Sequence, residues 1–139
     1  MSNSQVDTLL KQAARALNAG AMADLHQLSR QILQQDQDQP DAWFFMSIVA
    51  EAGRQPGKAL QFIDRALSID AQNAEYLSQK ARLHSLLNQY TEARAAALAV
   101  AALHSDSPIV LDTAGVVLTR TGDYLRAHEL LRKTVAMQP

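Results

Sequence analysis

Four histidines have the widest chemical scope in this sequence, as metal ligands or as general acids and bases. No two of them lie four residues apart, and none belongs to a His-Glu-x-x-His pattern, so the spacing of a helical zinc site is missing. We therefore expect side chains on the surface or partly buried, and no metal site. The histidines are His26, His84, His104 and His128.

Other signals of catalysis are also missing from the sequence. The chain of 139 residues has no cysteine, which excludes thiolate catalysis, disulfides and cysteine-bound metal clusters. It has no glycine-rich phosphate-binding loop, and no serine stands in a Gly-x-Ser-x-Gly elbow. The paired carboxylates Asp36 and Asp38 stand among glutamines, where we expect them to be solvated. We predict no enzymatic activity and no cofactor.

The composition is that of a globular protein with little net charge. Apolar residues make up 47% of the chain and charged residues 19%. A formal net charge of -1 lacks the basic footprint of a nucleic-acid binder, so no nucleic-acid partner is expected. The first residues contain no secretory signal, and the longest apolar run, Ala95 to Leu103, is far shorter than a membrane span. We expect a soluble, cytoplasmic protein with no membrane partner.

A repeat of 34 residues organises the chain. Ala59, Ala93 and Ala127 are spaced by this step. So are a set of small residues and a set of large apolar residues. The small set is Ala13, Ser47, Ala81 and Gly115, and the large set is Leu9, Trp43, Leu77 and Leu111. Within a single domain spanning 1–139, four units fit end to end at 6–39, 40–73, 74–107 and 108–139.

Each unit divides into two amphipathic helices joined by a turn, which predicts an all-α protein of about eight antiparallel helices. The clearest pairs are 74–87 with 90–104, and 108–121 with 124–137. Asn73, Ser107 and Asp123 precede three of these helices and are good N-caps. The small residues predict where paired helices cross closely, as at Ala81 and Ala93. Because one short pair cannot bury its apolar faces alone, the pairs are expected to stack into a solenoid.

This pattern resembles the tetratricopeptide repeat family. The second unit has the large Trp43 and small Ser47, and the fourth unit has Gly122-Asp123-Tyr124 and Ala127 at the family's turn and second helix. Across these repeats the resemblance covers essentially the whole chain. It implies a right-handed α-solenoid whose first helices line a concave groove that binds peptides or protein segments.

The resemblance implies which residues line that groove. Trp43 is expected in the core, so that at least one of the adjacent rings of Phe44 and Phe45 faces the groove; the alternative is that a neighbouring helix covers both. Arg82 and Arg120 would add cations beside this apolar patch. The predicted groove residues are Leu10, Ala14, Phe44, Phe45, Ile48, Gln79, Arg82, Asp112, Thr113, Val116 and Arg120.

Two hypotheses about function follow from the resemblance. The first is a non-catalytic scaffold that binds a protein or peptide in the groove. The alternative is an N-terminal recognition or dimerisation module of a larger bacterial enzyme, such as a sulfotransferase-like transferase. In either case the last helix is expected to leave an apolar strip uncovered and to form a homodimer through it. The predicted strip is Leu130, Leu131, Val135 and Met137.

Overall fold

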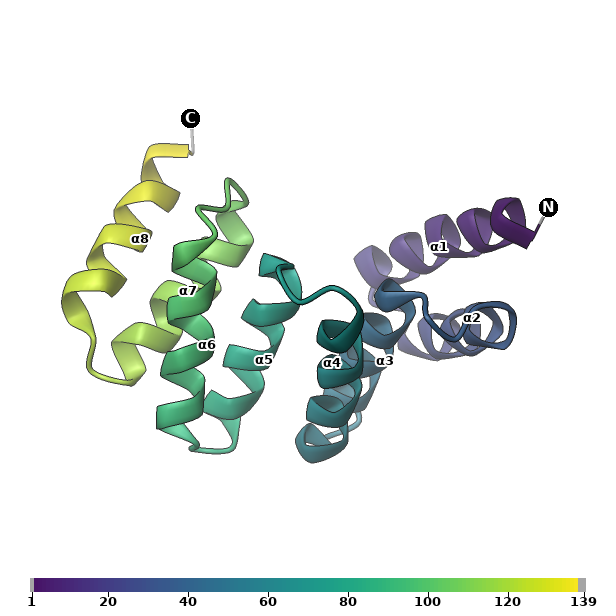
Figure 1. Cartoon of the computed structure of the whole chain (residues 1–139), viewed down its shortest axis with the longest axis horizontal. Helices are drawn as coiled ribbons and strands as arrows, with labels where there is room; N and C mark the ends of the chain where they lie inside the picture. The colour runs from purple at the N-terminus through teal and green to yellow at the C-terminus, as the bar shows by residue number, and fades with distance from the viewer. Residues whose placement is uncertain (1, 138–139) are drawn as a thin grey trace. The chain divides into compact units, whose positions relative to one another are not determined.

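The computed structural model describes residues 2–137 of the chain, and within this range it contains eight helices and no strand (Figure 1). The all-α prediction is therefore confirmed. No helix in this range is long and apolar enough to cross a lipid bilayer. The helices are α1 (Ser2–Ala19), α2 (Met22–Gln35), α3 (Pro40–Ala52), α4 (Pro56–Ile69), α5 (Ala74–Leu86), α6 (Tyr90–Ala102), α7 (Pro108–Arg120) and α8 (Tyr124–Met137).

The first helices of the later repeats begin where the sequence predicts. Proline opens α3 and α7, where its fixed φ suits a helix and its missing N–H needs no partner. The Asn73 side chain accepts a hydrogen bond from the backbone N–H of Tyr76 at 3.1 Å and so caps α5. Ser107 accepts from the N–H of Val110 at 3.5 Å and caps α7.

Helix α1 differs from its three counterparts. The first repeat unit is predicted to begin at residue 6, but α1 begins at Ser2 and runs for 18 residues, against 13 residues in α3, α5 and α7. Residues 3–6 contain neither proline nor glycine, so nothing in the backbone stops the helix from extending toward the N-terminus. Asp7 consequently lies outside the first turn, where its charge is not placed to favour the helix dipole.

The turns inside the repeats give backbone evidence for the 34-residue step. Each contains one residue in the left-handed region: Gly20 (φ 71°), Arg54 (φ 60°), Asn88 (φ 59°) and Gly122 (φ 88°). These four positions are spaced by 34 residues, although only two of them are glycine. The backbone therefore repeats more strictly than the sequence does.

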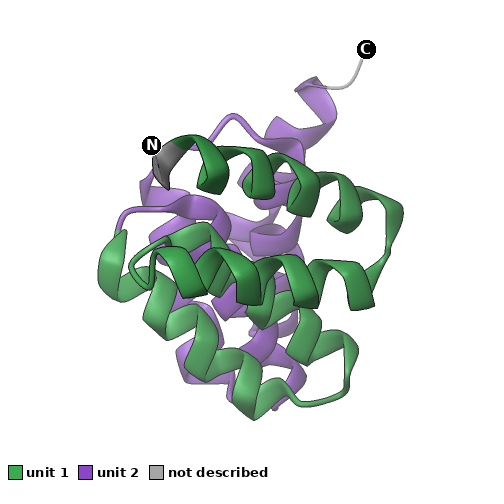
Figure 2. Cartoon of the chain, turned by 90° about the vertical axis from the view of Figure 1, so that its right-hand side faces the viewer, with its two compact units in different colours: residues 1–71 green, residues 72–139 purple. Residues whose placement is uncertain are grey.

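The helices form two compact units, residues 1–71 and residues 72–139, which we call unit 1 and unit 2 (Figure 2). In unit 1, α3 packs against α4 and α2, and α1 packs against α2. In unit 2, α5 packs against α6, α6 against α7, and α7 against α8, while the two first helices α5 and α7 also lie side by side. Each unit thus contains two helix pairs, and in each unit the second helix of one pair packs against the first helix of the next.

Small residues lie where the helices of a pair cross. Ala81 of α5 and Ala93 of α6 are fully buried in one cluster, as predicted. At the equivalent place in the next pair, a Cβ atom added to Gly115 of α7 would lie 2.8 Å from the Leu131 side chain of α8. The close approach therefore needs a small side chain on one helix so that the partner helix can fill the space.

Candidate peptide-binding face

The strongest candidate for an interaction surface is the outward face of α7 in unit 2. Ile109 is 80% exposed and Val116 is 49% exposed, which is unusual for large aliphatic side chains. Asp112 and Arg120 are exposed on the same side of the helix, and Thr113 is half-buried beside them. Spacings of three, four, seven and eleven residues bring these side chains onto one stripe. All four predicted groove residues of α7 thus lie on the stripe with Ile109.

The adjacent helix α5 contributes a second, narrower stripe. Glu75 and Arg82 are exposed, and Leu86 is 51% exposed, at spacings that again fall on one face. Because α5 and α7 pack side by side, we define the α5–α7 face as the seven exposed residues of these two stripes. They are Glu75, Arg82, Leu86, Ile109, Asp112, Val116 and Arg120.

Gln79 is a correction to the predicted groove. It is only 6% exposed, so it does not line an open surface. Gln79 lies three residues after Tyr76 and four before Leu83, and both of those side chains are fully or almost fully buried. These spacings place Gln79 on the buried face of α5 rather than on the stripe of Arg82.

The aromatic pair in unit 1 is the larger correction. Phe44 and Phe45 are each 7% exposed, so the expectation that one ring faces the groove is wrong. Helix α3 has neighbours on several sides, namely α1, α2 and α4, and it has no broad open face. The rings lie 5.8 Å apart between centroids and pack as part of the interior. Of the other residues predicted for this half of the groove, Leu10 and Ile48 are half-buried and Ala14 is exposed.

Trp43 occupies the position we had expected to be core, yet it remains half-buried at the edge of α3. Its ring stacks on Phe62 of α4 with the centroids 6.0 Å apart, and its indole N–H donates to the carbonyl of Gln37 at 2.8 Å. The guanidinium of Arg65 lies over the indole, 5.6 Å from its centroid. The indole N–H of tryptophan needs a hydrogen-bond partner, whereas a phenylalanine ring has no polar group. This difference explains why Trp43 is only half-buried while Phe44 and Phe45 are buried.

Helix α8 only partly has the expected apolar strip. Leu130 is 4% exposed because it shares the inward face of the helix with Ala127 and Thr134, so its assignment to an open strip is wrong. Leu131 is half-buried against Gly115. Val135 and Met137 are exposed at 69% and 40%. The sequence analysis missed Tyr124, which is 68% exposed and shares a face with Leu131 and Val135.

Asp123 forms ion pairs with two arginines of unit 2. Its carboxylate accepts hydrogen bonds from the guanidinium of Arg126 at 3.0 Å and from that of Arg94 at 3.3 Å. The hydrogen bond from Arg126 is the main reason that the pKa of Asp123 lies below its ordinary value. Asp123 also accepts from the backbone N–H of Arg126 at 3.4 Å, as expected of a cap for α8. Among the described residues, no group of three or more histidines and carboxylates is placed to hold a metal ion.

Comparison with solved structures gives the fold its name. The chain matches PilF of Pseudomonas aeruginosa with a TM-score of 0.83 and 20% identity, over 99% of this chain and 63% of that one. It matches YrrB, described as "a TPR protein with an unusual peptide-binding site", with a TM-score of 0.68 and 18% identity, over 99% of this chain and 71% of that one. The chain has the tetratricopeptide-repeat fold.

A third match is to one part of a much larger protein. The tetratricopeptide-repeat fold of this chain also matches an O-GlcNAc transferase of Thermobaculum terrenum, with a TM-score of 0.85 and 17% identity. The match covers 98% of this chain but 26% of the transferase, and the shared part is the repeat region. No family model and no curated protein sequence matches the chain.

Proposed function

We propose that the chain is a non-catalytic protein-interaction scaffold that binds a peptide or protein segment on the α5–α7 face. The observation that carries this proposal is where the apolar surface lies. Nine large hydrophobic residues are exposed within the described range, and eight of them belong to unit 2. Three of the eight, Leu86, Ile109 and Val116, lie on the α5–α7 face. Exposed apolar side chains grouped on one face are typical of a binding surface.

The α5–α7 face suits a ligand that has acidic, basic and apolar groups. Arg82 and Arg120 can meet carboxylates, Glu75 and Asp112 can meet basic groups, and the aliphatic side chains between them can hold an apolar anchor. Arg120 has its guanidinium 5.9 Å from the ring centroid of Tyr90, which restricts the side chain before any ligand arrives. Restricting a side chain beforehand reduces the entropy cost of binding.

The test is a selection of binding peptides from a random display library, using the whole chain as bait. Each selected peptide is then measured against two matched variants, Val116→Glu on the α5–α7 face and Val135→Glu on α8. Both changes introduce the same charge at an exposed valine of unit 2. We expect Val116→Glu to weaken binding about tenfold or more and Val135→Glu to change it less than about twofold. Peptides that bind both variants equally, or no selectable peptide at all, would contradict the proposal.

A second proposal concerns self-association, because α8 has an apolar face that no other helix of residues 2–137 covers. Tyr124, Leu131 and Val135 share this face, and among residues 2–137 the only helix packed extensively against α8 is α7. In α6 the equivalent Ala97 and Ala101 contribute to the core beside α7. We propose that two copies pair through the uncovered face of α8, with Val135 and Met137 at the contact and Leu130 excluded from it.

Sedimentation at several concentrations tests the dimer. The unmodified chain is expected to shift from monomer to dimer as its concentration rises, and Val135→Glu is expected to remove the shift. Val116→Glu provides the matched control, since it should leave the dimer intact. A monomer at all concentrations would refute self-association while leaving peptide binding on the α5–α7 face unaffected.

The alternative of a module within a sulfotransferase-like enzyme receives no support from the comparisons, in which the transferase shares the repeat region alone. Three further points remain predictions from the sequence. They are that the chain has no catalytic activity, that it has no nucleic-acid or membrane partner, and that it is cytoplasmic. A scaffold that binds a protein segment is the function that the exposed residues of unit 2 favour.

A further inference from the structure

A concave surface lies in unit 2 between the two second helices α6 and α8. It is a pocket of about 370 Å³. Its floor consists of Leu98, Ala101 and Ala102 on the α6 side and Leu130 on the α8 side, and none of these belongs to the α5–α7 face. We call it the α6–α8 groove. Its size is near the lower end of pockets that bind small ligands or a few residues of a peptide.

The floor explains an odd feature of the sequence. The run from Ala95 to Leu103 contains no polar residue, although α6 lies at the surface of unit 2. Ala96, Ala97 and Val100 of this run are buried in the core, whereas Leu98, Ala101 and Ala102 line the groove, where Leu98 and Ala101 also pack against the edge of the core. A helix that is apolar on two sides has a second surface to cover, and small side chains on that side allow another backbone to approach closely.

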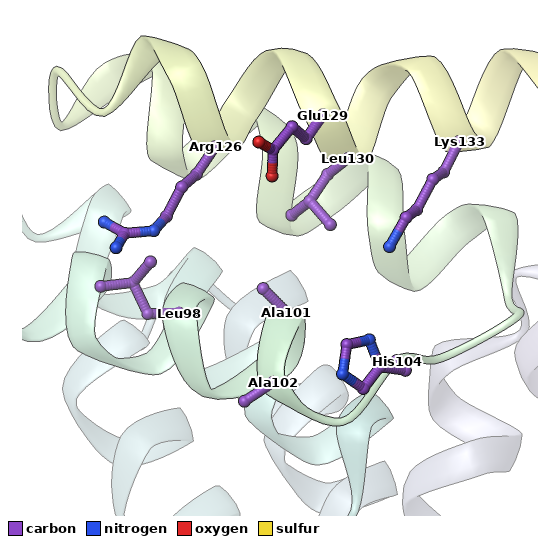
Figure 3. Close-up of a pocket in the computed structure, with 8 residues that line it drawn as sticks. All are labelled: Leu98, Ala101, Ala102, His104, Arg126, Glu129, Leu130 and Lys133. Carbon is purple, nitrogen blue, oxygen red and sulfur yellow. The ribbon is translucent and has the colours of Figure 1, made fainter.

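The rim of the groove is charged and mainly positive. Figure 3 shows Arg126 and Lys133 reaching from α8 toward α6, with Leu130 between them and His104 below Lys133. Arg126 is held in place by its hydrogen bond to Asp123, and its side chain is still 56% exposed. Within residues 2–137 neither Lys133 nor the remaining rim residue Glu129 forms an ion pair. Lys133 is therefore a cation beside an apolar floor, and it has no ion-pair partner in the part of the chain that the structure describes.

The spacing of the two cations restricts what can bind. Arg126 and Lys133 lie seven positions apart, which is about 10 Å along a helix, and in Figure 3 the two side chains extend from α8 in nearly the same direction. In an extended peptide, alternate side chains share a face at about 6.6 Å per pair of residues. A sequence of the form Asp-x-Leu-x-Asp thus presents one apolar and two acidic side chains to the same surface, with the carboxylates about 13 Å apart.

We propose that the α6–α8 groove is a docking site for an acidic peptide segment of a partner protein. An apolar side chain of that segment lies on Leu98, Ala102 and Leu130, and flanking carboxylates pair with Arg126 and Lys133. Carboxylates pair well with guanidinium and ammonium groups beside an apolar surface, where water competes less. This site is separate from the α5–α7 face, so the two surfaces can bind different segments.

Three short synthetic peptides with blocked ends serve as probes. The first contains Asp-Ser-Leu-Ser-Asp, the second replaces both aspartates with asparagine, and the third replaces the leucine with glycine. Each is titrated into the ¹⁵N-labelled whole chain while amide chemical shifts are recorded. The first peptide should cause saturable shifts at residues 98–104 and 126–133, and the other two should bind at least about fivefold more weakly.

Two neighbouring residues of α8 provide matched variants. Lys133→Glu reverses a charge at the groove, and Arg132→Glu reverses an exposed charge on another side of the same helix turn. We expect about tenfold weaker binding of the first peptide to Lys133→Glu and less than about a twofold change for Arg132→Glu.

The proposal would be overturned if no saturable shift occurred, if the aspartate and asparagine peptides bound equally, or if the two variants had equal effects. Shifts confined to residues 109–120 would also overturn it, and would instead support the α5–α7 face.

Discussion

Ser47 of α3 donates a hydrogen bond from its hydroxyl to the backbone carbonyl of Ala59 on α4, at 2.9 Å, and both residues are fully buried. The bond ties the two helices of a pair together where they cross. At the equivalent crossings the first helix has Ala13, Ala81 or Gly115, which have no side-chain polar atom to make such a bond. The second pair is therefore held by a specific polar contact as well as by close packing.

Ser47→Ala should destabilise unit 1 by about 1 kcal/mol, because it removes a buried hydrogen bond while keeping the small size. Ser47→Leu should cost more, since it forces a large side chain into the crossing and overpacking costs about 1–3 kcal/mol. Trp43 is the only tryptophan and belongs to unit 1, so its fluorescence during urea unfolding reports this unit. If Ser47→Leu proved no less stable than Ser47→Ala, the crossing would not be closely packed.

Gly115→Ala should destabilise unit 2, even though alanine is the better helix former. Alanine gains about 1 kcal/mol in helix propensity, but its Cβ would lie 2.8 Å from Leu131, and relieving that contact should cost more than the gain. Gly53→Ala is the matched control, because there the nearest atoms lie at 3.5 Å and φ is an ordinary -81°. We expect Gly53→Ala to be neutral or stabilising by about 0.5 kcal/mol in thermal unfolding.

Combining Gly115→Ala with Leu131→Ala tests the cause. If contact with Leu131 is the cost, the double variant should be more stable than the sum of the two single changes predicts. Simple additivity would mean that the glycine is there for another reason.

Arg54→Gly should stabilise the chain by about 0.5 kcal/mol. Arg54 has a φ of 60°, and this left-handed conformation costs a residue with a side chain about 1 kcal/mol. Glycine avoids this cost, but it loses more conformational entropy on folding, so the net gain in stability is smaller. The neighbouring Gln55 has a φ of -121°, so Gln55→Gly should instead lower the thermal midpoint. Identical effects of the two glycine substitutions would argue against strain at Arg54.

Asp123 should make unit 2 more stable at neutral pH than in acid. Its pKa is lowered in the folded state, chiefly by the hydrogen bond from Arg126, from an ordinary value of 3.8. The carboxylate of Asp123 therefore binds a proton more readily in the unfolded chain than in the folded one. Its contribution to the free energy of unfolding is complete above about pH 3.8, and it is lost as the pH falls through the pKa of the folded state. Helicity measured during urea unfolding between about pH 2.5 and 5 should show a smaller pH dependence for Asp123→Asn. An unchanged dependence would mean that the arginines do not stabilise the carboxylate.

Phe44→Ala should destabilise unit 1 by about 3–5 kcal/mol, as expected for a buried aromatic side chain. Tyr124→Ala is a suitable comparison, because an aromatic ring that is 68% exposed should contribute less than about 0.5 kcal/mol in the monomer. Trp43 fluorescence is the measurement for Phe44→Ala, and helix content by circular dichroism covers both variants. Similar costs for the two would contradict the burial of Phe44.

The fold was predictable because local and periodic signals agree. Asn73, Ser107 and Asp123 mark helix starts by a chemistry that depends on only a few neighbouring residues, and the 34-residue step links the four pairs. The start of α1 was not predictable in the same way, because nothing in the sequence before Asp7 ends a helix.

The surfaces were harder to predict because exposure depends on which helices pack nearby. The stripe of Ile109 and Val116 follows from helical spacing alone, whereas Phe44 and Phe45 are buried because α3 has three neighbours in its unit. Leu130 faces inward because it shares a face with Ala127, a spacing that was visible in the sequence but not used. The α6–α8 groove joins residues that are about thirty positions apart, and only its apolar run in α6 was visible beforehand.

The four left-handed turn residues bear on how such a chain can be recognised. Gly20, Arg54, Asn88 and Gly122 adopt one backbone conformation although they are of three different residue types. A search that scores side-chain identity sees little agreement at such positions, whereas a search that superimposes backbones sees the same turn four times. Sequence identities of 17–20% alongside TM-scores of 0.68–0.85 are expected when the backbone conformation is more constrained than the residue types that adopt it.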